Sequence, residues 1–469
     1  MPGPLQLPLL RHGAACLLTA VALIGCSASR PSASASTPAH APVAAVPAPQ
    51  VVARVAPAPA PVFPVMLGID VLESEGFAIL KGKRVGLLTH PAGVNRRGVS
   101  TIEVLRHAPG VQLVALFAGE HGINGEFRAG VNIRDHIDPR TGLPVFSLYN
   151  GVLQNGHVNR PTRGQLKGID VFVVDLQDIG TRSYTFISAM KTAMEGCFDN
   201  GVEFVVLDRP NPLGGLKVDG PSLDPQLMSY IGEFRVPYVH GLTMGELAHM
   251  AKEAPGVLDV TDAVREAGKL VVVPMRGWRR GMRWPDTGLT WVPTSTHMPD
   301  FLAVEGYPMT GLGTGAPSPF TSGVENEYLF RCISCKGVKL DTVEKDLRAL
   351  HLPGIDFRKA SVPNPKTGQP AVCLFIEITD WDAWNPTELN FNLLKLACKY
   401  DPRNPFAVAT RTAAGRQELH LFLIAVGSTA FYNDLIAHGA RVDADAYFRD
   451  WQAKARVYQQ LSRRYWIYY

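Results

Sequence analysis

The sequence lacks the signatures of several large classes of protein. It has no long run of lysine and arginine, and its formal net charge is only +4 in 469 residues, so nucleic-acid binding is not indicated. It has no GxGxxG motif after its first predicted strand and no P-loop, which are the fingerprints of nucleotide-binding enzymes. HExxH and GxSxG motifs are also missing, so neither a zinc hydrolase nor an α/β-type serine hydrolase is indicated. We therefore expect no cofactor and no metal ion.

Cysteine is also scarce, with seven residues in the whole chain. Cys332 and Cys335 form a single CxxC motif, and Cys373 and Cys398 lie too far apart to supply a second one. A zinc site usually needs four ligands, so this spacing does not favour zinc. A local disulfide or buried thiols, in an oxidising compartment, are the better interpretation.

The N-terminus has the pattern of an exported protein. A run of apolar residues, 13–24, follows Arg11 and is too short to span a bilayer, as is typical of a signal peptide. It ends in Leu-Ile-Gly-Cys, which resembles the lipobox of bacterial lipoproteins and implies acylation of Cys26; a plain secretory signal cut nearby is the alternative. Residues 27–62 are rich in Ala, Pro and Ser and predict an extended linker. We expect a membrane-anchored, periplasm-facing envelope protein, and Ser27 favours the outer membrane of a Gram-negative bacterium.

The rest of the chain alternates short apolar strands with helices. This pattern is typical of an α/β fold whose parallel sheet is covered on both faces. We predict a Rossmann-like domain over 63–290 and a smaller mixed α/β domain over 291–469, after the signal peptide (1–26) and the linker (27–62). The predicted strands are 84–89, 111–117, 143–149, 170–176, 203–207, 270–273 and 371–379, and the predicted helices include 183–200, 386–400 and 444–465.

Chemically useful side chains follow these strands. Glu120 and His121 come directly after strand 111–117, in a glycine-rich loop. Because parallel strands end at the same edge of a sheet, we expect the residues after the other strands to gather beside them. Each has a structural alternative: Glu120 or Asp178 could cap a helix, and Arg182 could be a solvated charge. The other candidates at this edge are His90, Tyr149, Asp175, Asp178, Arg182, Tyr184, Arg209, Asn211 and, from a later loop, His240.

This set consists of carboxylates, arginines and aromatic rings, which suits sugar chemistry. Glycosidases use one carboxylic acid to protonate the leaving oxygen and usually a second carboxylate as base or nucleophile. Arginine in such a pocket suits a substrate that carries its own carboxylate. Glu246, by contrast, follows Thr243 at the spacing of a capping box, so we interpret it as structural.

Several long motifs resemble the NamZ family of exo-β-N-acetylmuramidases, in order from about residue 68 to 469. Among them are LVALFAGEHGINGEFRAG (113–130), LKGIDVFVVDLQDIGTRSYTFISAM (166–190) and FVVLDRPNPLGG (204–215). The resemblance implies a Rossmann-like domain followed by a smaller α/β domain that completes the pocket. It also implies release of N-acetylmuramic acid from the non-reducing end of peptidoglycan fragments, with Glu120 as the catalytic acid. We predict Asp178 as the second carboxylate, or as the group that orients the 2-acetamido group of the sugar. The predicted substrate-binding residues are His121, Arg128, Tyr149, Asp175, Arg182, Tyr184, Arg209, Asn211 and His240.

Two further expectations concern the substrate. The lactyl carboxylate of muramic acid would give Arg128, Arg182 or Arg209 a partner. The chain departs from the family pattern at 309–320, a shorter loop without the usual Asn and acidic residues, and at His297, where the family usually has Asn. The second hypothesis is therefore an envelope lipoprotein that binds peptidoglycan without cleaving it, and a nucleotide-dependent sugar enzyme ranks last.

Overall fold

A computed structural model describes residues 65–469, except for residues 129, 151–152, 155–156, 316, 325–326 and 365–366. The predicted signal peptide, Cys26 and the whole predicted linker lie outside the described residues. Within the described ranges, no helix is both long and apolar enough to cross a membrane.

The first half of the structure is built on a seven-stranded sheet with the order β3-β4-β2-β1-β7-β8-β9. Every neighbouring pair is parallel except β3 and β4, so the predicted Rossmann-like, mostly parallel α/β sheet is confirmed. The six apolar runs expected in this half form six of its strands. The strands are β1 (Arg84–Thr89), β2 (Gln112–Ala118), β3 (His136–Ile137), β4 (Pro144–Ser147), β7 (Val171–Asp175), β8 (Glu203–Leu207) and β9 (Leu270–Val273), with a separate small hairpin of β5 (Leu153–Gln154) and β6 (His157–Val158).

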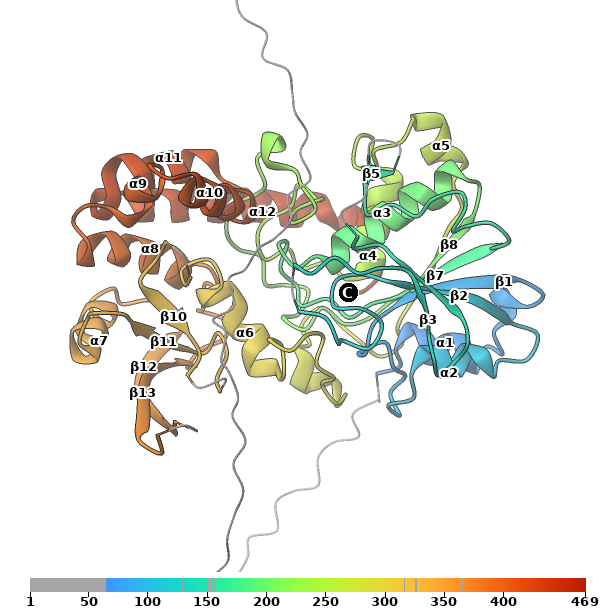
Figure 1. Cartoon of the computed structure of the whole chain (residues 1–469), viewed down its shortest axis with the longest axis horizontal. Coiled ribbons are helices and arrows are strands. Elements are labelled where there is room, and N and C mark those ends of the chain that lie inside the picture. Colours follow the sequence, from blue (N-terminus) through green and yellow to red (C-terminus); the bar gives the residue numbers. More distant parts are fainter. Residues whose placement is uncertain are drawn as a thin grey trace, which may run out of the picture. The chain divides into compact units, whose positions relative to one another are not determined.

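Helices cover both faces of this sheet (Figure 1). On one face, α1 (Gly68–Ser74) and α2 (Thr101–Arg106) pack on Val85 and Leu87 of β1. On the other face, α3 (Phe186–Asp199) and α4 (Met244–Glu253) pack on Leu88. Because successive side chains of a strand point to opposite faces, a strand buried on both sides must be apolar throughout. The remaining short elements of this half are η1 (Ala78–Leu80), η2 (Pro225–Leu227), α5 (Asp262–Ala267) and η3 (Trp284–Thr287).

The helix ends follow the expected signals. The hydroxyl of Ser100 accepts a hydrogen bond from the Glu103 backbone N–H at the start of α2. Thr243 and Glu246 form a reciprocal capping box at the start of α4, which confirms the structural role of Glu246. Gly201 follows α3 with φ +68°, a left-handed conformation that glycine adopts without a steric penalty.

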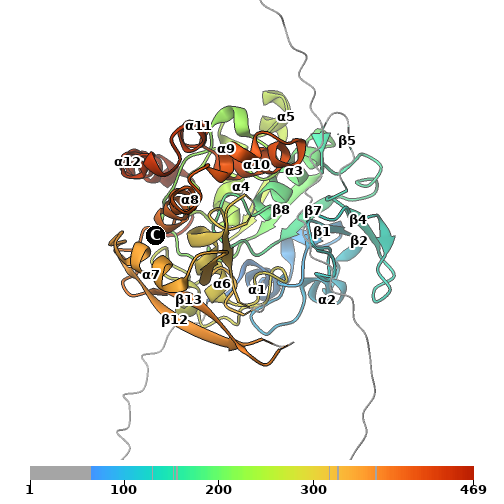
Figure 2. The ribbon, with the colours of Figure 1, turned by 60° about the vertical axis from the view of Figure 1, so that its left-hand side comes forward.

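The second half contains an antiparallel four-stranded sheet with the order β10-β11-β13-β12. The predicted strand 371–379 is β13, and it pairs with β12 along a long hairpin (Figure 2). The strands are β10 (Phe320–Ser322), β11 (Cys332–Cys335), β12 (Ile355–Pro363) and β13 (Pro370–Ile378). The helices are α6 (Phe301–Thr310), α7 (Leu340–Arg348), α8 (Glu388–Tyr400), α9 (Pro405–Ala409), α10 (Ala413–Val426), α11 (Thr429–His438), η4 (Gly439–Arg441), α12 (Ala444–Ser462) and η5 (Arg463–Tyr465).

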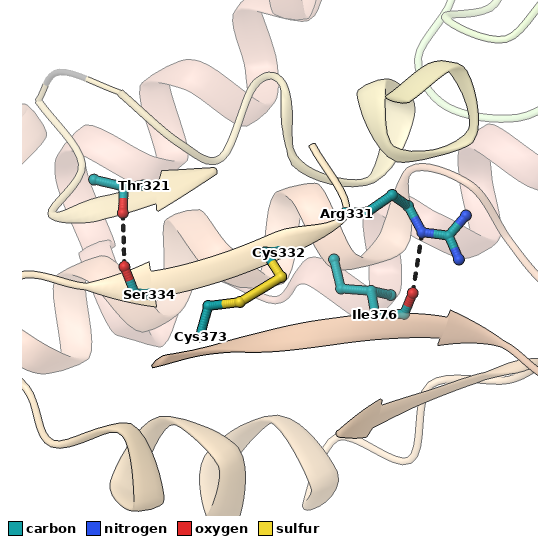
Figure 3. Close-up of a disulfide and its surroundings, with 6 residues drawn as sticks. All are labelled: Thr321, Arg331, Cys332, Ser334, Cys373 and Ile376. Carbon is teal, nitrogen blue, oxygen red and sulfur yellow. Dashed lines mark hydrogen bonds between the residues drawn. A yellow bond between two sulfur atoms is a disulfide. The ribbon is translucent and has the colours of Figure 1, made fainter. Parts of the chain in front are cut away.

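A disulfide joins two strands of this sheet, and it is not the local one that was one of the two interpretations of the CxxC motif. Cys332 of β11 is bonded to Cys373 of β13, 41 residues away (Figure 3). Cys335 remains a buried free thiol and packs in the main core of this half. On a strand, residues three apart point to opposite faces, so Cys332 and Cys335 face different sides of the sheet. The local pairing was therefore wrong, and the alternative of buried thiols is correct for Cys335 and Cys398.

The last residues of the chain return to the first sheet. The hydroxyl of Tyr468 donates a hydrogen bond of 2.7 Å to Asp208 Oδ2, just after β8. It also accepts one from the Met275 backbone N–H. The ring of Trp466 stacks under the guanidinium of Arg280, whose partner is Glu246. The C-terminal tail thus helps to hold the loops after β8 and β9 in place.

Candidate active site

Glu120 lies one residue beyond the glycine that follows β2, at the carboxyl edge of the sheet. Its side chain is half-buried, and both carboxylate oxygens have a hydrogen-bond donor. The Gly130 backbone N–H donates to Oε1 at 2.9 Å, and the Thr185 hydroxyl donates to Oε2 at 2.7 Å. Thr185 directly precedes α3, so the Glu120 carboxylate is held between its own loop and the start of a buried helix.

His121 supports the loop that carries Glu120. Its ring Nδ1 lies 3.0 Å from the Phe127 carbonyl oxygen. Because a carbonyl only accepts, Nδ1 carries the proton and Nε2 is left as the other functional atom of a neutral ring. His121 has φ +73°, an unusual conformation for a residue with a side chain, and such positions cluster at functional sites. The His121 side chain is buried and lies near His297, which is exposed. The pKa of His297 is lowered mainly by its partial burial and, to a smaller extent, by His121.

Asp178, after β7, is a buried carboxylate with one engaged and one unengaged oxygen. Its Oδ2 accepts a hydrogen bond of 2.7 Å from the Gly180 backbone N–H. The same oxygen lies 3.5 Å from Nε2 of His240, whose Nδ1 accepts from the Leu242 backbone N–H. A neutral His240 therefore carries its proton on Nε2 and presents it to Asp178. Oδ1 of Asp178 has no hydrogen-bond partner among the described residues.

A group of tyrosines surrounds these two carboxylates. The hydroxyl of Tyr307, on α6, contacts the Ser183 hydroxyl, which in turn donates to Tyr238 at 2.9 Å. Burial raises the pKa of Tyr307, and the negative charges of Glu120 and Asp178 raise it further. Tyr307 is thus neutral and near both carboxylates. The sequence did not single it out, because it comes from the second half of the chain.

Two predicted aromatic residues also lie at this edge. The hydroxyls of Tyr184 and Thr294 share a hydrogen bond of 2.6 Å, and the ring of Tyr184 packs edge-on against that of Tyr307. Tyr149, after β4, packs at 5.8 Å from the ring of Tyr230. The pKa of Tyr230 is raised mainly by burial and, second, by the negative charge of Glu120. Tyr149 and Tyr230 therefore lie on the side of the site that holds Glu120.

Asp175 and Arg209 lie at the same edge, but they bind each other. Arg209 Nε and Nη2 donate to the two oxygens of Asp175 at 2.6 and 2.9 Å, and Thr101 also donates to Asp175. Asp175 is fully buried and Arg209 is 2% exposed. Their ion pair links the ends of β7 and β8 to the start of α2, so Asp175 has a structural role, while Arg209 also lines a neighbouring cavity.

Of three other predicted side chains, two have structural partners and one has none among the described residues. Arg182 is fully buried and donates to the Val426 carbonyl at the end of α10, where the helix dipole favours a cation. The Asn211 side chain bridges the Leu242 carbonyl and the Leu213 backbone N–H, so it shapes a loop. Arg128 is exposed, and its side chain makes no hydrogen bond or ion pair with the described part of the chain. Of the three predicted arginine ligands, only Arg128 leaves its guanidinium open to solvent.

A cavity of about 230 Å³ lies at the same edge, on the other side of Gln177. Its walls come from the loop after β1, from Arg209 and from the segment around Trp284, and none of the residues discussed around Glu120 lines it. His90 lies between the two regions: its Nε2 accepts from the Gln177 backbone N–H, and its ring packs on Phe186. Burial, and then Arg209 and His121, lower the pKa of His90 well below its usual value, so this ring is neutral.

The edge of the sheet therefore collects Glu120, His121, Asp178, Tyr184 and His240 on one side of His90. Two carboxylates with different environments, among neutral tyrosines, can supply an acid and a base or nucleophile. Within the described residues, no three His, Cys, Asp or Glu side chains are grouped to hold a metal ion.

Comparisons with known proteins bear on the family and the fold of the chain. The model of the N-terminal domain of "Exo-beta-N-acetylmuramidase NamZ" matches residues 85–302, and that of its C-terminal domain matches residues 305–468. A peptidoglycan beta-N-acetylmuramidase NamZ from Bacillus subtilis (strain 168) is 39% identical over 334 residues, which is 71% of this chain and 77% of that protein.

Two crystal structures of DUF1343 family proteins from Bacteroides fragilis NCTC 9343 share the fold. One is 34% identical with a TM-score of 0.74, and it covers 87% of this chain and 100% of the solved chain. The other is 22% identical with a TM-score of 0.60, covering 86% and 99% respectively, and shows likeness of fold only.

Proposed function

Because this chain belongs to the exo-β-N-acetylmuramidase NamZ family, we propose that it is a glycosidase of cell-wall turnover. Its substrates are muramyl saccharides derived from peptidoglycan, and it releases N-acetylmuramic acid from their non-reducing ends. The single observation that carries the proposal is the pair of carboxylates at the carboxyl edge of the sheet, within a chain matched over both domains of the family.

Glu120 is the proposed general acid. Hydrolysis of a glycosidic bond requires a carboxylic acid fixed in orientation and open on one side to the leaving oxygen. The hydrogen bonds from Gly130 and Thr185 support this role, because they orient the carboxyl group without enclosing it. His121 acts through the loop, since its bond to the Phe127 carbonyl holds the segment that returns to Gly130.

Asp178 is the proposed second carboxylate. The bond from Gly180 and the nearby His240 fix one of its oxygens, and the other is available to a ligand. An available, oriented oxygen suits either attack on the sugar and activation of water, or a hydrogen bond from the N–H of the 2-acetamido group. The neutral hydroxyl of Tyr307, near both carboxylates, is a donor for a substrate oxygen in the same space.

We further propose that the enzyme is a lipoprotein of the cell envelope, anchored through Cys26 and facing the periplasm. The lipobox-like sequence and the linker support this location, and several acyl chains suffice for stable anchoring. The disulfide between Cys332 and Cys373 is compatible with an oxidising compartment. Fractionation of cells that express the full chain should find it with membranes, and Cys26→Ser should release it. A Cys26→Ser protein that stays with the membrane would contradict the anchor.

The test of function is release of the chromophore from 4-nitrophenyl β-N-acetylmuraminide by the purified full chain. Glu120→Gln keeps the shape of the side chain but removes its acid, so we expect activity to fall by roughly 100-fold or more. Glu126→Gln is the matched control, because Glu126 lies on the same loop but is exposed and only contacts the Asn124 backbone.

The control should retain full activity and both variants should unfold like the wild type. A folded wild-type chain that binds peptidoglycan but cleaves no muraminide would instead support the non-catalytic binding protein. Full activity of Glu120→Gln would show that another group is the acid.

A further inference from the structure

The cavity beyond Gln177 has the properties of a binding pocket. Apolar side chains, among them Val94 and Leu289, form part of its wall, and Trp284 adds an aromatic surface. Two arginines, Arg96 and Arg209, also line it. A concave, largely apolar site with a few polar groups is the usual form of a small-molecule site.

Its polar groups are mainly donors that lack a partner. The Arg96 guanidinium is exposed and makes no ion pair with the described residues; only its backbone N–H is engaged, by Asp70. Arg209 uses Nε and Nη2 for Asp175 and the Val94 carbonyl, which leaves Nη1 without a bond to any described residue. Asn95 Nδ2 and Trp284 Nε1 are buried N–H donors with no hydrogen-bond partner in the described structure.

The acceptors near this pocket are mostly occupied. Asp70 accepts from the backbone N–H groups of Leu67 and Arg96, and Asp175 is paired with Arg209. Arg97, also at the pocket, pairs with Glu73. Among the described side chains at the pocket, Oε1 of Gln177 is a buried acceptor without a partner, and the amide nitrogen of Gln177 donates to two carbonyls. A buried donor without a partner costs stability, so the pocket favours a ligand that brings acceptor oxygens.

We propose that this pocket binds the lactyl group of the muramyl unit. This proposal rests on the proposed function and names the part of the site that distinguishes muramic acid from glucosamine. A lactyl ether carries a carboxylate and a methyl group on one carbon. The carboxylate matches the guanidinium groups of Arg96 and Arg209, and the methyl group matches the apolar wall at Val94 and Leu289.

The pocket is joined to the proposed catalytic residues by short segments of the chain. Gln177 lines the pocket, and the next residue in the chain is Asp178, the proposed second carboxylate. The Gln177 amide donates to the Asp178 carbonyl, so both belong to one rigid turn. The segment that brings Trp284 to the pocket continues to Thr294, which contacts Tyr184 on the catalytic side.

The decisive variant is Arg96→Gln in the full chain. Its side chain is exposed and its backbone contact to Asp70 is kept, so folding is unaffected. Loss of a charge-assisted hydrogen bond should raise KM for 4-nitrophenyl β-N-acetylmuraminide by about tenfold, with kcat nearly unchanged. Affinity for free N-acetylmuramic acid, measured by calorimetry, should fall by a similar factor, whereas any affinity for N-acetylglucosamine should not change. Arg106→Gln, an exposed arginine on α2 that pairs with Glu103 away from the pocket, is the matched control and should behave as the wild type.

A second variant tests the aromatic wall. Trp284→Phe keeps a ring but removes the N–H, so it should weaken N-acetylmuramic acid binding by a smaller factor than Arg96→Gln. Wild-type affinity and KM in Arg96→Gln would overturn the proposal, as would equal losses for N-acetylmuramic acid and N-acetylglucosamine. If the wild type cleaves no muraminide but binds N-acetylmuramic acid through Arg96, the proposed function fails while the pocket remains assigned.

Discussion

Asp175 and Asp178 lie three residues apart at the end of β7, and the structure gives them opposite environments. Asp175 has both oxygens bound, by Arg209 and Thr101, and no exposed surface. Asp178 has one oxygen bound by Gly180, with His240 beside it, and one oxygen without a partner. A fully buried carboxylate that is paired with a buried guanidinium stabilises the fold, whereas a fixed carboxylate with a free oxygen is equipped to meet a ligand.

The same contrast separates the arginines. Arg209 is held by Asp175 and by the Val94 carbonyl, and Arg182 by the carbonyls at the end of α10. Burial lowers the pKa of Arg182 to about 10, which still leaves it charged at neutral pH. Arg96 and Arg128 keep exposed side chains and make no ion pairs with the described residues. The arginines predicted from the strand ends are thus mostly structural supports, and the accessible charge comes from the loops around them.

The largest expected effect on stability belongs to Asp175→Asn. The amide keeps the shape of the side chain but leaves the Arg209 guanidinium buried without a counter-charge, which should lower the free energy of unfolding by about 3–5 kcal/mol. Urea denaturation at pH 7 measures this change. Asp170→Asn is the control, because Asp170 forms an exposed ion pair with Arg84 and its loss should hardly move the urea midpoint. Equal urea midpoints for Asp175→Asn and wild type would show that Asp175 does not stabilise the fold more than Asp178 does.

The sequence predicts the edge of the sheet well, because the information is local. Apolar runs such as 84–89 and 203–207 are long enough to be buried strands, and a parallel sheet places Glu120, Asp178 and Arg209 at one edge. Caps at Ser100 and Thr243 are equally local, since a helix start is set by residues three positions apart.

The partners of these residues could not be predicted, because they depend on distant segments. Arg182 meets Val426, 244 residues later, and Cys332 bonds Cys373 instead of its neighbour Cys335. Tyr307 reaches the site from α6, in a helix that the sequence analysis did not identify. Which charges stay free for a substrate is decided by such long-range contacts and not by the type of residue at the strand end.

Asp178→Asn should have a smaller effect on stability and a larger one on catalysis. The amide oxygen can still accept from Gly180, and removing a buried, half-engaged charge should change the free energy of unfolding by less than about 1 kcal/mol. If Asp178 is the second carboxylate, kcat for the chromogenic muraminide should fall by roughly 100-fold, about 2.7 kcal/mol in the activation barrier. Urea denaturation and single-turnover kinetics therefore distinguish the two aspartates. Asp175→Asn should mainly lower the free energy of unfolding, whereas Asp178→Asn should mainly lower kcat. Retained kcat would mean that the free oxygen of Asp178 does not take part in the reaction, and that the second function must come from the substrate itself or from another group near Glu120.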